Sequence, residues 1–197
     1  EMSELATGVG DLKKVLQNVK TRGVIGEVQL GAILDQFLSP EQYAHNVKIK
    51  PGTTESVEYA VKLPGKDVSE NAVLLPIDSK FPVEDYQRLN EIYERIDEYS
   101  KEDIKKAEKE FVKVVKKAAK QIRDKYISPP TTTNFALMFV PTEGLYSQVL
   151  RSTGLFESLQ TEFKITVVGP SNLVAFLNSS CSYFLIICLS DKGSTFE

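Results

Sequence analysis

The sequence predicts an α/β fold, and three observations lead to this prediction. Residues 43–50 and 57–63 alternate apolar and other side chains, which is typical of strands with one buried face. Residues 72–82 begin with a continuous apolar run, which is typical of a strand buried on both faces. Long segments with helical spacing of apolar residues separate these strands from two more apolar runs, at 134–140 and 164–168.

The elements follow one another in a simple order. Helices are expected at 11–19 and 24–38, separated by a basic turn at 20–23. The strand at 57–63 and the strand after it are joined by the turn Pro64-Gly65-Lys66-Asp67 and form an antiparallel hairpin. Further helices are expected at 83–99, at 101–126, at 145–163 with a break at Gly154, and after Ser171, a helix cap.

Bulk composition narrows the function classes. With 197 residues, 42% of them apolar, the chain suits one domain with a real core. Its net charge of -3 gives no global attraction to nucleic acid, so such binding needs a local patch. Cys181 and Cys188 are the only cysteines and no signal peptide is visible, which favours a cytoplasmic protein. No apolar run has the length of a membrane span, so no membrane contact is expected from this segment.

The end of the strand at 72–82 carries two opposite charges. Asp78 and Lys80 are two residues apart, so strand alternation points both to one face. Burying either charge alone would cost several kcal/mol. One interpretation is a buried ion pair. The other is a metal-dependent phosphodiester-cleaving site, in which the aspartate binds Mg²⁺ and the lysine holds the attacking water or the phosphate.

Glu58 joins this pair through the hairpin. The start of one antiparallel strand lies beside the end of the next, so we expect Glu58 and Asp78 to be neighbours. Two adjacent carboxylates repel, and a divalent cation relieves that repulsion. Taken alone, Glu58 is typical of a solvated strand face, and its expected pairing with Asp78 is what favours a site. Pro76 cannot donate a ladder hydrogen bond, so we expect a bulge or an unpaired position there.

Two more polar residues bear on the site. Glu27 lies in the first turn of the helix expected at 24–38, where it either points into a site or is favoured by the helix dipole. Gly23 and Gly26 flank it and leave room for close backbone approach. His45 is the only histidine, and without a second ligand nearby it is expected to be a core or edge residue.

The helix at 101–126 has two contrasting faces. Its apolar positions are Ile104, Ala107, Phe111, Val114 or Val115, Ala118 and Ile122. Its other face carries lysines that either follow a phosphate backbone or form a solvated surface, as the interleaved glutamates indicate. These lysines are Lys105, Lys106, Lys109, Lys113, Lys116, Lys117 and Lys120.

Several short motifs lie in order between residues 10 and 178. They are Lys20-Thr21-Arg22-Gly23 with Gly26-Glu27, Lys62-Leu63-Pro64-Gly65, Pro76-Ile77-Asp78-Ser79-Lys80-Phe81-Pro82, Lys125-Tyr126-Ile127-Ser128-Pro129-Pro130 with Thr132, Phe139-Val140-Pro141 with Glu143-Gly144, and Gly169-Pro170. This set resembles the RmuC family of DNA recombination proteins. Members of that family usually carry an N-terminal membrane anchor and a long coiled coil, whereas the sequence begins at Glu1 without them.

The resemblance implies a fold and an activity. The fold is a mixed central β-sheet flanked by helices, with the α-β-β-β-α-β core of the restriction-endonuclease-like PD-(D/E)xK superfamily. It implies one domain over 1–180, with a helical insertion at about 83–127 and an atypical tail at 181–197. The implied function is a metal-dependent DNA nuclease that limits rearrangement at inverted repeats. The alternative is a DNA-binding or scaffolding module that keeps the fold without the reaction.

The resemblance also assigns residues. Glu58, Asp78 and Lys80 take the catalytic positions, although Val57 and Glu58 replace the Pro-Asp of the superfamily motif. Mg²⁺ or Mn²⁺ is the implied cofactor, and DNA and recombination or repair proteins are the implied partners. The expected metal ligands are Glu27, Glu58, Asp78 and the carbonyl of Ser79. The expected DNA-binding residues are Lys20, Arg22, Lys105, Lys109, Lys113 and Lys116.

Overall fold

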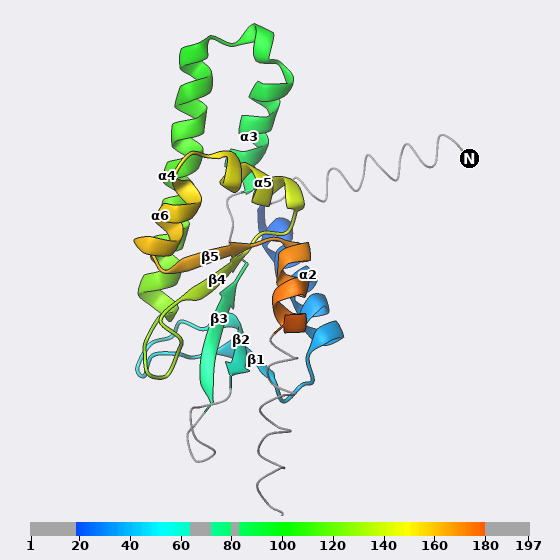
Figure 1. The fold of residues 1–197 in the computed structure, drawn as a ribbon, viewed down its shortest axis with the longest axis vertical. Coiled ribbons are helices and arrows are strands. Elements are labelled where there is room, and N and C mark those ends of the chain that lie inside the picture. Colours follow the sequence, from blue (N-terminus) through cyan, green and yellow to red (C-terminus); the bar gives the residue numbers. More distant parts are fainter. Residues whose placement is uncertain (1–18, 64–71, 80–82, 180–197) are drawn as a thin grey trace, which may run out of the picture.

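A computed structural model describes residues 19–63, 72–79 and 83–179 of the chain (Figure 1). The helix expected at 11–19, Lys80 and the tail at 181–197 fall outside these ranges, apart from Val19. In the described ranges, no helix has the length and apolar character needed to cross a membrane.

A five-stranded mixed sheet forms the centre of the molecule (Figure 1). Its strands are β1 (Tyr43–Val47), β2 (Val57–Leu63), β3 (Val73–Asp78), β4 (Ala136–Phe139) and β5 (Ile165–Val168), in that spatial order. Strand β2 runs antiparallel to both of its neighbours, β1 and β3, whereas β3, β4 and β5 are parallel. The predicted α/β class and the predicted hairpin of β2 and β3 are therefore confirmed.

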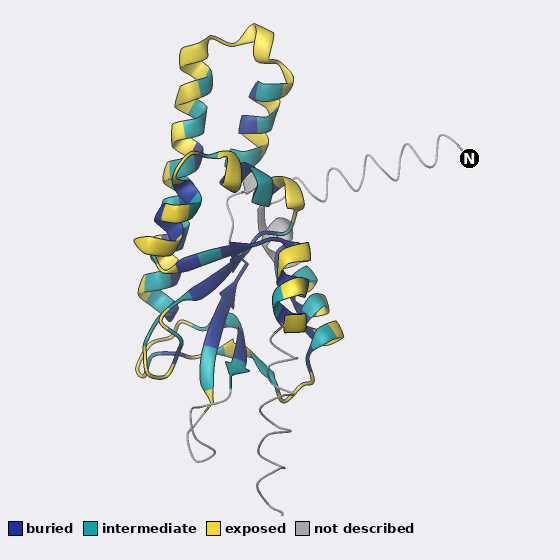
Figure 2. Cartoon of the chain, viewed as in Figure 1, coloured by how far each residue is buried: buried dark blue, intermediate teal, exposed yellow. Residues whose placement is uncertain are grey.

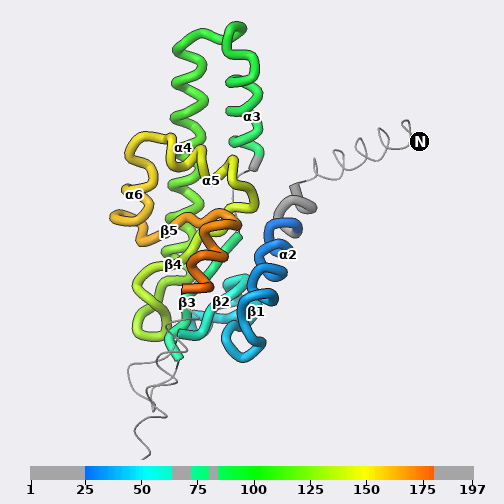
Figure 3. Tube along the Cα trace, turned by 45° about the vertical axis from the view of Figure 1, so that its right-hand side comes forward, coloured from blue at the N-terminus to red at the C-terminus, as the bar shows by residue number. Residues whose placement is uncertain are grey.

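Helices cover both faces of this sheet (Figures 1 and 3). The labelled helices are α2 (Val19–Phe37), α3 (Val83–Glu94), the 3₁₀ turn η1 (Ile96–Glu98), α4 (Lys101–Tyr126), α5 (Glu143–Arg151) and α6 (Leu155–Thr161). A further helix occupies residues 170–179. One core cluster joins α4, α5 and α6 to one face of the sheet, and a second joins α2 and the helix 170–179 to the other. The result is a three-layer α/β/α arrangement.

The connection between β3 and β4 is a long helical hairpin. Its two helices, α3 and α4, project beyond the sheet, and their outer ends are exposed (Figure 2). Ser100 starts α4 with a capping box, in which its hydroxyl accepts from the Asp103 N–H and the Asp103 carboxylate accepts from the Ser100 N–H. The bounds of α4 agree with the prediction. Its buried side chains include Phe111, Val115 and Ile122 of the predicted apolar face, and Ala118 packs partly buried against the same core, while Ala119 is a further buried position.

Two other predictions need correction. The expected basic turn at 20–23 is helical, because α2 runs unbroken from Val19 through Gly23 and Gly26. Each interior glycine costs about 1 kcal/mol in helix propensity, and the burial of Leu30 and Leu34 against the sheet offsets that cost. The helix expected at 83–99 ends at Glu94, and Ile96, which follows it, lies 51% exposed at the hairpin tip.

The segment after β4 behaves largely as predicted. Gly154 separates α5 from α6 with φ +70, a left-handed conformation that glycine adopts without strain. Ser171 was expected to cap the last helix but lies inside it. Its N–H donates a 2.8 Å hydrogen bond to Oε1 of Glu143, so a carboxylate from α5 caps this helix instead.

Candidate functional site

The β2–β3 hairpin brings Glu58 and Asp78 face to face. Tyr59 pairs with Ile77 in this antiparallel ladder, and one further step of the same register places Glu58 opposite Asp78. Directly opposed residues share a face and have Cβ atoms about 5 Å apart. The two acidic residues are therefore neighbours at the end of β3, where β3 also pairs in parallel with β4.

Ser79 links the two strands at this point. Its N–H donates a 3.0 Å hydrogen bond to Oε2 of Glu58, and its hydroxyl donates to the same oxygen. Asp78 is fully buried and Ser79 is 5% exposed, so the carboxylate of Glu58 is fixed by groups that water does not reach freely. Hydrogen bonds to a charged group in such surroundings stabilise by about 1.5–3 kcal/mol.

Helix α2 lies directly over this end of β3. A Cβ atom added at Gly26 would be 3.7 Å from both Cβ and the carbonyl oxygen of Ser79, which is ordinary van der Waals contact. Ile77 packs in the same core cluster as Leu30 and Leu34 of α2. Because side chains alternate along a strand, Asp78 belongs to the opposite face from Ile77.

Glu27 does not join the two acids. It lies well inside α2 rather than in the first turn, since the described helix begins eight residues earlier, at Val19. Its Oε1 is 3.2 Å from Nε2 of His45 on the edge strand β1. The ring of His45 lies against Tyr59, with centroids 4.7 Å apart. Sequence reasoning missed this group, because the partners of His45 become visible only when α2 docks on β1 and β2.

The electrostatics of this end of the sheet act on Tyr59. Burial, and then the nearby negative charges of Glu27, Asp35 and Glu58, raise the pKa of the Tyr59 phenol above its ordinary value. The Tyr59 phenol therefore stays protonated to a higher pH than an ordinary tyrosine. Tyr43, whose centroid is 6.2 Å from that of Tyr59, donates its own hydroxyl to Asp35.

The oxygen donors at this site fit a hard divalent ion. Mg²⁺ is usually held by one or two carboxylates, with water and substrate phosphate completing its shell, and Glu58 with Asp78 supplies two. Across the described ranges, however, no three His, Cys, Asp or Glu side chains are grouped to hold a metal. The donor set thus suits an ion held by two carboxylates and not a cage of three.

The predicted cationic residues fall into three groups. Lys80 lies outside the described residues. Lys20 and Arg22 belong to α2, and only their backbone is described. The other four, Lys105, Lys109, Lys113 and Lys116, lie on α4.

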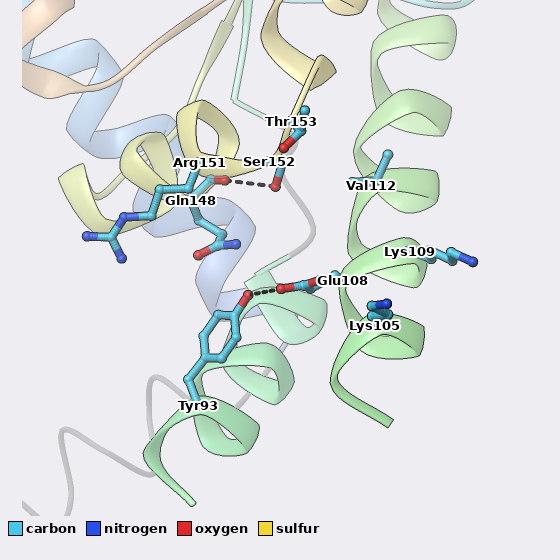
Figure 4. Close-up of a pocket in the computed structure, with 9 residues that line it drawn as sticks. All are labelled: Tyr93, Lys105, Glu108, Lys109, Val112, Gln148, Arg151, Ser152 and Thr153. Carbon is cyan, nitrogen blue, oxygen red and sulfur yellow. Dashed lines mark hydrogen bonds between the residues drawn. The ribbon is translucent and has the colours of Figure 1, made fainter. Parts of the chain in front are cut away.

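A cleft between α3, α4 and α5 contains two of these lysines (Figure 4). Its volume is about 860 Å³, and sequence reasoning missed its other polar residues, because they come from separate helices. Inside it, the Tyr93 hydroxyl donates a 2.8 Å hydrogen bond to Glu108. The complete lining is Tyr93, Lys105, Glu108, Lys109, Val112, Gln148, Arg151, Ser152 and Thr153.

Fold and site together define an α/β protein with two neighbouring acidic residues at the end of β3, the strand at which the sheet changes from antiparallel to parallel pairing. The RmuC family model matches residues 1–185, and the chain belongs to the RmuC family. Two curated relatives named DNA recombination protein RmuC homolog, from Xylella fastidiosa strains Temecula1 and 9a5c, are each 48% identical over 194 residues. The alignment covers 98% of this chain and 42% of each relative, so the chain spans about two fifths of their length. No solved structure matches significantly.

Proposed function

We propose that this chain carries the phosphodiester-cleaving site of a DNA recombination protein, and that its fold is the restriction-endonuclease-like PD-(D/E)xK core. The observation that supports this proposal most is the register of β2 and β3, which sets Glu58 opposite Asp78. The elements α2, β1, β2, β3, the α3–α4 hairpin and β4 follow the α-β-β-β-α-β order of that superfamily. The name of the relatives, DNA recombination protein RmuC homolog, supports a role in DNA recombination.

In the proposed mechanism each residue has a distinct task. Glu58 and Asp78 would hold Mg²⁺ or Mn²⁺, with the Ser79 carbonyl as a further oxygen donor. When bound, the ion supplies Lewis-acid stabilisation of charge that develops on the phosphate. Ser79 fixes the Glu58 carboxylate through two hydrogen bonds, so that the donor is positioned before the substrate arrives. Lys80, two residues after Asp78, orients the attacking water and takes part in its deprotonation.

A cleavage assay tests this proposal. The chain is incubated with linear and single-stranded DNA in Mg²⁺ or Mn²⁺, and the variants Asp78→Asn, Glu58→Gln and Lys80→Ala are compared with it. We expect loss of at least about a hundredfold in rate for each, as removal of one electrostatic contribution to the transition state usually costs. Glu91→Gln and Asp97→Asn remove charges from exposed positions of the α3 region and should leave the rate unchanged.

A second function has an observation in its favour. Asp78 is fully buried and Glu58 is bonded to a backbone N–H, which also describes a structural polar network in a non-catalytic DNA-binding or scaffolding module. Metal titration separates the two functions. If Asp78→Asn abolishes Mn²⁺ binding in calorimetry while the chain stays folded, the site is a metal site. If the variant only lowers the free energy of unfolding and Mn²⁺ still binds, the network is structural.

A further inference from the structure

The cleft between α3, α4 and α5 is separate from the carboxylate pair and carries positive charge. Lys105 and Lys109 come from α4, and Arg151 comes from the last turn of α5. Glu108 is the one acidic residue of the lining, and its carboxylate accepts a hydrogen bond from Tyr93. Three cations against one carboxylate make this a site for an anionic ligand.

The floor of the cleft is an ordered polar surface. Gln148 is 6% exposed, and its main-chain carbonyl oxygen accepts a 2.9 Å hydrogen bond from the Ser152 hydroxyl. Burial, and then the hydrogen bond to Glu108, raise the pKa of Tyr93, whereas the positive charge of Arg151 opposes that shift. Tyr93 and Arg151 both line the cleft.

The arrangement of the cations favours an extended ligand over a single phosphate. Figure 4 shows Arg151 of α5 and Lys109 of α4 pointing away from each other on opposite sides of the cleft, so the charges do not converge on one point. A volume of about 860 Å³ lies within the range of small-molecule pockets. The cleft is thus large enough for a few nucleotides of one strand and too small for a duplex.

Positive charge continues out of the cleft along α4. Five lysines of α4 are spaced three or four residues apart: Lys105, Lys109, Lys113, Lys116 and Lys120. At 3.6 residues per turn, they fall within an arc of about 80° and extend over about 22 Å of the helix. Within the described part of the chain, Lys105, Lys109 and the two later members, Lys116 and Lys120, make no ion pair. Lys113 is paired with Glu110 at 3.7 Å. Unpaired cations at helical intervals suit successive phosphates of a strand.

The cleft and the carboxylates lie at the same edge of the sheet. Helix α3 starts a few residues after β3 ends, and its Tyr86 contacts Gly144 at the start of α5, which follows β4. Tyr93 is two turns, or about 10 Å, farther along the same face of α3. A strand held in the cleft therefore lies farther out along α3 than Tyr86, and it would run back along this helix to reach the end of β3.

We propose that this cleft binds the sugar-phosphate backbone of a single nucleic acid strand through Lys105, Lys109 and Arg151, and feeds it toward Glu58 and Asp78. This proposal rests on the proposed function, because it assumes that the chain acts on DNA. To the proposed function it adds a second site, formed by Arg151 and the polar residues of the cleft, which positions the strand and is separate from the residues that hold the ion.

The test measures binding by the full 197-residue chain without metal. Fluorescence anisotropy follows a labelled single-stranded oligothymidine in EDTA over a series of salt concentrations. We expect Lys105→Gln/Lys109→Gln to weaken binding about tenfold and to reduce the salt slope by about 1.4, since each lost phosphate contact lowers the slope by about 0.7. Arg151→Gln is expected to reduce it by about 0.7.

A matched control comes from the same helix. Lys106→Gln/Lys117→Gln removes the same charge from exposed positions outside the cleft, and its affinity should stay within about twofold of the unaltered chain. Any of four results would overturn the proposal. Both double variants lose the same affinity, or the unaltered chain shows no salt-dependent binding. Alternatively, inorganic phosphate displaces the strand at matched ionic strength, or the cleft variants lose as much affinity for a duplex of the same sequence as for the single strand.

The two proposals fail in different ways. Binding in EDTA does not depend on cleavage, and Asp78→Asn should bind the strand as tightly as the unaltered chain. A chain that binds through the cleft but cuts no DNA overturns the nuclease alone. A chain that cuts DNA while its cleft variants bind normally overturns the cleft alone.

Discussion

Replacement of Gly31 by alanine tests how closely α2 docks on the sheet. In a helix interior, alanine is favoured over glycine by about 1 kcal/mol, so propensity alone predicts stabilisation. The structure predicts the opposite sign. The added Cβ would lie 3.2 Å from Cζ of Tyr59 and closer still to its hydroxyl oxygen. The Tyr59 ring has little freedom to move, because it lies against His45 at 4.7 Å and Tyr43 at 6.2 Å.

The expected magnitude follows from the two opposing contributions. Overpacking a fitted contact costs about 1–3 kcal/mol, and the gain in propensity offsets about 1 kcal/mol of it. Gly31→Ala should therefore destabilise the chain by about 1 kcal/mol. For a protein of this length, that corresponds to a fall in Tm of about 2–4 °C.

A double-mutant cycle followed by urea unfolding, with far-UV circular dichroism as the signal, measures the effect. Tyr59→Phe removes the hydroxyl oxygen, and in that background Gly31→Ala should be neutral or stabilising, with a coupling energy of at least about 1 kcal/mol. Gly52→Ala is the control, because Gly52 has φ +78 and nothing within 4 Å of an added Cβ. The destabilisation caused by Gly52→Ala should be the same in the unaltered chain and in the Tyr59→Phe background. Stabilisation by Gly31→Ala in the unaltered chain, or equal effects in both backgrounds, would refute the reasoning.

Three further predictions concern the scaffold. Ser100→Ala removes the cap of α4 and should lower the free energy of unfolding by about 1 kcal/mol. Phe111→Ala, at a side chain only 1% exposed, should cost about 3–5 kcal/mol in the same urea experiment, whereas Leu150→Ala, at a 49% exposed position, should stay within about 0.5 kcal/mol. Burial and Glu108 raise the pKa of Tyr93. In an ultraviolet absorbance titration, Tyr93→Phe should therefore remove a phenol that ionises at higher pH than the other tyrosines. Loss of a phenol that ionises at lower pH would contradict this. A raised phenol pKa stabilises the fold below pH about 10, and that contribution is lost as pH rises through the folded pKa.

Local patterns predicted the strands better than the helix ends. The alternation at 57–63 gave the bounds of β2, and the hairpin followed from the turn after it. The pairing of Glu58 with Asp78 also follows from the hairpin, because antiparallel register is a short-range property. By contrast, Gly23 and Gly26 indicated a helix start that tertiary packing overrides.

Contacts between distant segments were beyond the reach of the sequence pattern. His45 meets Glu27 only because α2 crosses β1, and no spacing along the chain indicates that crossing. The cleft joins side chains from α3, α4 and α5, so Arg151 carried no signal until the helices were placed. The lysine stripe was visible from helical periodicity, but its entry into a cleft was not.

The topology explains why both features meet at one edge. β3 is antiparallel to β2 and parallel to β4, so the end of β3 lies beside both the start of β2 and the end of β4. The pairing with β2 places Glu58 beside Asp78. The pairing with β4 places α5, which follows β4 and carries Arg151, at the same end of the sheet. In open α/β sheets, ligands bind beyond the carboxyl ends of parallel strands. If the proposed function and the proposed strand site both hold, Asp78→Asn should lose DNA cleavage and retain strand binding, because the sheet holds the acids and the helices hold the cleft.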